Sequence, residues 1–127
     1  MPFRPETELA LERGRTLYNT GHYYEAHEVW EAAWLGERGE VRQLLQGLIQ
    51  AAAGYFKALA HHRPGGAARL LAAGLEKLAP FPEGFAGLSL APFREGLARS
   101  LEQVRRWNEG KASGLDPALA PPLERAG

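Results

Sequence analysis

Side chains able to do chemistry gather in one short stretch of the sequence, residues 19–34. The stretch contains two of the four histidines, His22 and His27, and three glutamates. If it forms a helix that turns by about 100° per residue, His27 and Glu31 share one side and Glu28 lies at its margin. Histidine exchanges protons near neutral pH, and a neighbouring carboxylate can orient its ring. His27, Glu28 and Glu31 are therefore candidate catalytic residues for acid–base chemistry on a small molecule.

A metal site is a second interpretation of the same stretch. His27 and Glu31 stand four residues apart, so one helix face could supply two ligands to a divalent cation. The pattern His-Glu-x-x-Glu departs from the zinc-protease helix, which has histidine at the last position. A third ligand would come from His22, His61 or His62. A divalent metal is the one cofactor that the sequence suggests.

Aromatic and polar side chains near these residues could line a binding site. Two of them belong to the same stretch, and three follow in the next apolar segment. Sites for small molecules commonly combine such side chains with a few polar groups that fix the ligand's orientation. The candidate ligand-binding residues are Tyr24, Trp34, Arg42, Gln46 and Gln50. Their types do not identify a substrate.

Two interpretations without chemistry stand beside these. Because buried charges need partners, His27 and the acids could pair with Arg42 and the glutamines as a structural polar layer between two helices. Such a layer would set the register of the helices and bind no ligand. Alternatively, the aromatic residues Tyr23, Trp34 and Trp107 could form a surface for a protein partner or for a second copy of the chain.

Each segment that carries these residues is predicted to be a helix. Apolar residues recur every three or four positions, and no segment alternates with a period of two. We predict an all-α, single-domain bundle of about five helices. The predicted helices cover about residues 5–18, 23–35, 40–62, 70–78 and 90–108, with loops at 36–39, 63–66 and 80–89.

The helix at about residues 40–62 has the widest apolar face. One neighbour could not cover that face, so we predict that this helix is central, buried and in contact with each of the others. Small residues along one side should let another helix approach closely, and the pair His61 and His62 should be its frayed end. The small residues are Gly47, Ala51, Gly54 and Ala58.

The short loop after the second helix makes the second and third helices antiparallel neighbours. Glu31 and Gln46 lie at similar distances from this loop. We therefore predict that His27 and Glu31 are substantially buried at the interface of these two helices, near Gln46 and Arg42. The helical domain is predicted to span residues 1–113, followed by a Pro-rich, irregular C-terminal tail at 114–127.

The composition limits which partners we expect and indicates the cellular compartment. Fifteen basic and fifteen acidic residues cancel, so we expect neither nucleic acid nor an anionic membrane as a partner. The absence of cysteine and of an apolar N-terminal run fits a reducing cytoplasm, with no signal peptide. Twelve arginines against three lysines are typical of a thermophilic or GC-rich source.

The stretch also resembles the signature of a known prokaryotic family, the domain-of-unknown-function 309 family. The matching pattern runs Asn-x-Gly-x-Tyr-aromatic-Glu-Ala-His-Glu-x-x-Glu-x-x-Trp and continues as Leu-Gln-Gly-Leu-Ile-Gln. The resemblance implies an all-helical single domain and no particular activity. The matching residues are Asn19, Gly21, Tyr23, Glu25, Ala26, His27, Glu28, Glu31, Trp34, Gln46, Gly47 and Gln50.

A weaker likeness is to the tetratricopeptide repeat. Its helical hairpin has small and aromatic residues in positions like those of Gly21, Tyr23 and Ala26. Only one copy is visible, and a lone hairpin builds no solenoid. The likeness leaves a protein-interaction module as an alternative function.

Overall fold

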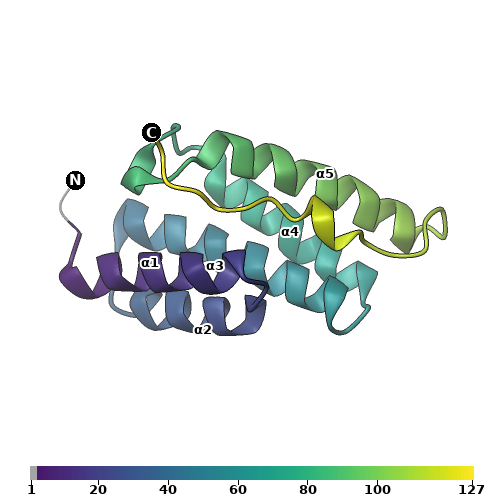
Figure 1. Ribbon diagram of the computed structural model, residues 1–127, viewed down its shortest axis with the longest axis horizontal. Helices are drawn as coiled ribbons and strands as arrows, with labels where there is room; N and C mark the ends of the chain where they lie inside the picture. Colours follow the sequence, from purple (N-terminus) through teal and green to yellow (C-terminus); the bar gives the residue numbers. More distant parts are fainter. Residues whose placement is uncertain (1–2) are drawn as a thin grey trace.

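Five α-helices form the structure, a computed structural model that describes residues 3–127 (Figure 1). No strand occurs among these residues, and a single isolated bridge joins Leu88 to Arg125. The prediction of an all-α, five-helix domain is confirmed. The helices are α1 (Pro5–Asn19), α2 (Tyr23–Trp34), α3 (Gly39–Leu59), α4 (Pro64–Leu78) and α5 (Leu90–Asn108), with two short 3-10 helices, η1 (Phe85–Gly87) and η2 (Pro117–Leu119).

The long helix α3 is the centre of the bundle. Helices α2 and α4 pack directly against it, and α1 and α5 pack against α2 and α4 (Figure 1). Side chains join α3 to the two outer helices: the ring centroids of Tyr55 and Tyr18 lie 6.1 Å apart, and the Tyr55 hydroxyl donates to Ser100 Oγ at 2.7 Å. Thus α3 meets every other helix, two of them through long side chains rather than through close backbone packing.

The strip of small residues on α3 lets a neighbouring helix pack closely against it. A Cβ on Gly47 would lie 2.7 Å from the Leu78 side chain, and a Cβ on Gly74 would lie 3.0 Å from the carbonyl oxygen of Gly47. Real side chains do not fit at such distances, so the glycines are what allow α3 and α4 to touch. The predicted close helix crossing is confirmed, and its partner is α4.

The boundary between α3 and α4 differs from the prediction. Helix α4 begins at Pro64 rather than near residue 70, because proline at the first helical position lacks only an N–H that would be unpaired anyway. Helix α3 ends at Leu59 rather than at residue 62, so His61 and His62 follow the helix instead of forming its last turn. His62 takes a left-handed conformation (φ 53°), and the N–H of Arg63 donates to the carbonyl of Lys57 at 3.1 Å, which closes the helix with an ordered turn.

The tail after α5 is irregular apart from η2, and it runs back between α1 and α5 (Figure 1). Leu115 and Leu123 are buried in the core, with 8% and 0% of their surface exposed. The tail is therefore part of the packed structure. Among residues 3–127, no helix combines the length and apolar character that a membrane span requires.

Candidate functional site

The predicted site residues lie along the hairpin of α2 and α3. Two contacts fix how these helices face each other: the rings of Tyr24 and Phe56 lie 5.2 Å apart, and the Arg42 guanidinium lies 3.8 Å from the centre of the Trp34 ring. In this antiparallel register His27 lies at the level of Gln50, and Glu31 at the level of Gln46. We call this row the α2–α3 stripe. It comprises Tyr24, His27, Glu31 and Trp34 from α2, and Arg42, Gln46, Gln50 and Phe56 from α3.

The stripe is half-exposed, so the predicted burial was wrong for Glu31. The side chain of Glu31 is 51% exposed, whereas that of His27 is 24% exposed. The core-facing side of α2 is taken by Ala26, Trp30 and Ala33, all of which are buried. The side that carries His27 and Glu31 therefore turns to the edge of the helix interface.

His27 can act through one of its ring nitrogens. Nε2 lies 3.6 Å from a Glu31 carboxylate oxygen, which is an ion-pair distance beyond hydrogen-bond range. Nδ1 is buried and has no hydrogen-bond partner within residues 3–127. The Nε2 edge, beside the carboxylate of Glu31, is thus the one open to an incoming group. Such a pair could hold or transfer a proton, or bind a donor from a partner.

The pairing expected of a structural polar layer is not found. Arg42 stacks on Trp34 and donates from Nη1 to the Glu37 carbonyl at 3.3 Å. Gln50 Oε1 is buried and lacks a hydrogen-bond partner in the described part of the chain. No hydrogen bond between described residues joins His27 or Glu31 to Arg42 or to the glutamines.

The geometry does not fit the metal interpretation. Within the described residues, no group of three or more His, Asp or Glu side chains is arranged to hold a metal ion. Of the candidates for a third ligand, His22 contacts Thr20 Oγ1 at 2.9 Å, and the His61 ring packs 4.7 Å from the Phe56 ring. His62 lies in the turn after α3. Glu28 is exposed on α2.

The three aromatic residues of the suggested partner surface do not form one surface. Tyr23 packs among core rings, 5.3 Å from Tyr18. Trp34 lines a shallow cavity with Lys77, near the end of α4, whereas Trp107 precedes Asn108, which lies beside Gly65 at the start of α4. Trp34 and Trp107 are therefore at opposite ends of α4. Of the three, Trp34 alone belongs to the stripe.

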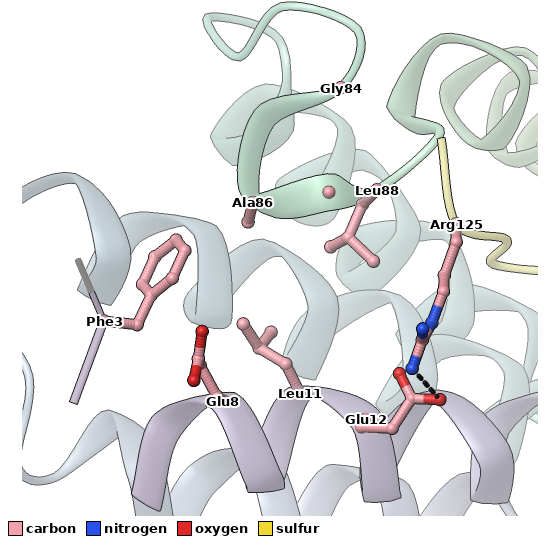
Figure 2. A pocket seen from close by; sticks show the side chains of 9 residues that line it. Phe3, Glu8, Leu11, Glu12, Gly84, Ala86, Leu88 and Arg125 are labelled. Atoms are coloured by element: carbon pink, nitrogen blue, oxygen red, sulfur yellow. Dashed lines mark ion pairs between the residues drawn. The ribbon is translucent and has the colours of Figure 1, made fainter. Parts of the chain in front are cut away.

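Each end of the stripe opens into a shallow cavity. One, of about 450 Å³, is lined by Tyr24, Phe56 and neighbouring residues. The other, of about 390 Å³, is lined by Trp34, Arg42, Gln46 and residues of α4 and the preceding loop. His27 and Glu31 lie between the cavities and line neither. A larger cavity, of about 560 Å³, lies away from the stripe, between α1 and the segment around η1 (Figure 2).

Comparison with known proteins adds the family. Residues 11–70 match the model of a family described as Domain of unknown function (DUF309), and every residue of the stripe falls within that match. This chain carries a DUF309 domain. The resemblance seen in the sequence is confirmed.

One relative of this DUF309 chain comes from Aquifex aeolicus (strain VF5). The two are 33% identical over 102 residues, which is 76% of this chain and 28% of the relative. The relative bears the name "Uncharacterized protein". The chain thus spans little more than a quarter of the relative's length, so the matching region is one part of a longer polypeptide there.

Sequence reasoning missed Phe56 and Lys77 as neighbours of the site. Phe56 belongs to the apolar face of α3, where it looks like an ordinary core residue. Counting from the loop did not reveal it either, because Phe56 lies 17 residues past Gly39 at the start of α3, whereas Tyr24 lies ten residues before Trp34 at the end of α2. Lys77 offered no signal, because its place depends on how closely α4 approaches α3.

Proposed function

We propose that this DUF309 chain is a cytoplasmic protein-binding module whose α2–α3 stripe takes a helical segment of a partner protein. One observation carries the proposal: residues through which the chain resembles the family, among them His27, Glu31 and Trp34, meet on a half-exposed surface instead of pairing inside the core. Neither nucleic acid nor membrane is part of this proposal. The match to one portion of a longer relative supports a module that works beside other domains.

The dimensions of the stripe favour a helix as the occupant. Tyr24 and Trp34 are ten residues apart on α2, a span of about 15 Å. A partner helix of about three turns would place apolar side chains against the shallow cavities at the two ends. Aromatic residues such as Tyr24, which is 46% exposed, are frequent anchors at such interfaces.

The centre of the stripe would select the partner's polar residues. The Glu31 carboxylate, beside His27 Nε2, presents hydrogen-bond acceptors, whereas Arg42 adds positive charge toward the Trp34 end. A partner helix with a basic residue at its middle would complement Glu31. Charge reversal at Glu31 should therefore weaken binding much more than charge reversal at an exposed site on α5.

The test begins with a photocrosslinking residue placed at Gln43, which is exposed and lines the cavity at the Trp34 end of the stripe. A crosslinked segment, once identified, is synthesised and its affinity measured by calorimetry for wild type, Glu31→Arg and Trp34→Ala. We expect at least tenfold weaker binding for both variants and an unchanged affinity for the control Glu102→Arg. Equal affinity across all four proteins would rule out the stripe as the binding surface.

The His27 and Glu31 pair also favours a second candidate, acid–base chemistry on a small molecule. A thermal-shift screen of metabolites on wild type and His27→Ala distinguishes the two. A ligand at about a hundred times its dissociation constant should add nearly 3 kcal/mol of stability to the protein that binds it. A metabolite that stabilises wild type but not His27→Ala would favour the enzyme over the protein-binding module.

A further inference from the structure

The last part of the chain lies between α1 and α5 in the manner of a bound peptide (Figure 1). One residue shows this most directly. Asn19 Nδ2 donates to the Leu123 carbonyl at 2.9 Å, and the Leu123 N–H donates to Asn19 Oδ1 at 2.8 Å. A single side-chain amide thus satisfies both backbone groups of one residue 104 positions away in the sequence.

Three further side chains bind the tail through its backbone carbonyls. The Tyr18 hydroxyl donates to Pro121 at 2.7 Å, Ser100 Oγ donates to Leu119 at 3.2 Å, and Arg15 Nη1 donates to Leu123 at 3.2 Å. Burial raises the pKa of Tyr18, so its phenol stays protonated and remains a donor. These contacts recognise an extended backbone.

Alternate side chains of the tail face inward. Pro121 and Leu123 are buried, whereas Pro122 and Glu124 are exposed, which is the two-residue period of an extended segment lying on a surface. The surface is shaped for the proline, since a Cβ on Gly96 would lie 2.3 Å from the Pro121 side chain. We call this surface of α1 and α5 the tail groove. It holds Pro121 and Leu123 at two-residue spacing, and Leu119, half-buried at the end of η2, precedes them.

Proline suits the groove for a second reason. It has no N–H, so Pro121 brings no donor that would need a partner when buried. The fixed backbone of Pro121 and Pro122 also reduces the conformational entropy that an extended ligand loses on binding. The groove therefore matches a segment of the pattern Leu-x-Pro-x-Leu, which in the tail is Leu119 to Leu123.

The tail does not fill the space available to it. A cavity of about 350 Å³ remains beside it, lined by Pro92 and Arg99 of α5 and by tail residues. The 560 Å³ cavity lies at its far end, where Figure 2 shows Arg125 reaching from the tail toward Glu12 of α1, at 3.0 Å. The connection from α5 is largely exposed between Glu109 and Gly114. The tail is thus joined to the bundle by a segment that could let it leave.

We propose that the tail groove is a binding site for an extended Leu-x-Pro-x-Leu segment of another protein, and that residues 115–125 occupy it as an intramolecular competitor. The side chains that bind residues 119–123 belong to α1 and α5, apart from the α2–α3 stripe. The tail also reaches one end of the stripe, where Pro117 lines the 450 Å³ cavity with Tyr24 and Phe56. This inference does not depend on the function proposed for the stripe.

The test uses the full chain with a protease cleavage site in place of residues 111–113. Cutting leaves the tail bound without a covalent link, and a fluorescein-labelled peptide of residues 114–127 then competes for the groove. A tethered competitor acts at an effective concentration in the millimolar range. We therefore expect the labelled peptide to bind the cut protein at least tenfold more tightly than the uncut protein, with the helical circular dichroism signal retained.

Peptide variants supply controls that leave the protein unchanged. Leu123→Asp in the peptide, or a scrambled peptide of the same composition, should lose binding, whereas an unrelated peptide with Leu-x-Pro-x-Leu should retain it. On the protein side, Asn19→Ala should weaken binding and the exposed substitution Glu102→Ala should not. Loss of helicity on cutting, or failure of the labelled peptide to exchange, would overturn the proposal. A dimer of the uncut protein that exchanges tails would assign the groove to a second copy and would also overturn it.

Discussion

Gly14 and Trp30 meet where α1 crosses α2, and this contact shows how much one residue decides. A Cβ on Gly14 would lie 2.0 Å from Trp30 Nε1, and Trp30 is completely buried. The indole therefore occupies the space that any side chain at position 14 would need. Because Trp30 fixes the core-facing side of α2, it also determines that His27 and Glu31 lie at the edge of the interface.

Gly14→Ala should destabilise the protein even though alanine is the better helix former. The extra methyl group must displace Trp30, and overpacking of this kind costs about 1–3 kcal/mol or more. Gly65→Ala, in α4, is the matched control, since the nearest atom to its Cβ would be Asn108 Oδ1 at 3.5 Å, an ordinary van der Waals distance. It should raise stability by about 0.4–1 kcal/mol. Urea unfolding of both variants measures the difference, and equal stabilities would contradict the packing argument.

At this scale, sequence could predict which residues share a side but not which side faces the core. Helical spacing correctly grouped His27 with Glu31, and the same spacing places Ala26 and Trp30 together on another side of the helix. Both groups include residues that can be buried, so periodicity alone did not rank them. The close approach at Gly14 resolves the ambiguity, and it depends on a contact between helices.

The helices themselves were largely predictable, and the errors in their predicted bounds have a clear cause. Helix α5 has the expected bounds because its apolar stripe is regular and Gly110 follows its end. Helix α4 was shortened in the prediction because Pro64, Gly65 and Gly66 resemble a turn. The proline in fact starts the helix and the glycines continue it; a Cβ on Gly66 would lie 3.2 Å from the Lys57 side chain of α3.

An ion-pair cluster between α1 and the tail gives this pair of elements a pH dependence. Hydrogen bonding to Arg15, and then to Arg125, lowers the pKa of Glu12 from 4.5 to about 2. A carboxyl whose pKa is lowered by folding contributes stability above its unfolded pKa, and that contribution is lost as pH falls from about 4.5 toward 2. Acid should therefore loosen the end of the tail from α1.

A fluorophore on residue 126 would report this loosening as a fall in anisotropy between about pH 4.5 and pH 2. Glu12→Gln should remove most of the pH dependence and leave the tail end more mobile at neutral pH. Glu8→Gln is the control, because Glu8 lines the same cavity without an ion pair among residues 3–127. If the fall in anisotropy persisted unchanged in Glu12→Gln, other carboxyl groups would be its cause.

At the scale of the whole molecule, the sequence did not predict that the tail packs between α1 and α5. Composition predicted that residues 114–127 would be irregular, and prolines explain that. Nothing in local spacing connects Asn19 with Leu123, because the contact joins the two ends of the chain and involves backbone atoms. The α2–α3 stripe was more accessible to prediction because a short loop fixes its register.

This difference between local and long-range packing predicts a hierarchy of opening. The backbone of α3 is enclosed by its neighbours, and residues such as Leu48 and Ala52 have no exposed surface. Their amide hydrogens should exchange with solvent through global unfolding alone, whereas the Leu123 amide, bound to a side chain at the surface of α1, should exchange through local release of the tail.

Native-state hydrogen exchange measures this hierarchy residue by residue. The Leu123 amide should exchange at least tenfold faster than the amides of Leu48 and Ala52, with a smaller dependence on denaturant, because tail release exposes little surface. If the Leu123 amide were as protected as α3, tail and bundle would unfold as one unit. The tail groove would then be a permanent part of the core, since a segment that leaves only when the protein unfolds cannot yield its place to a partner.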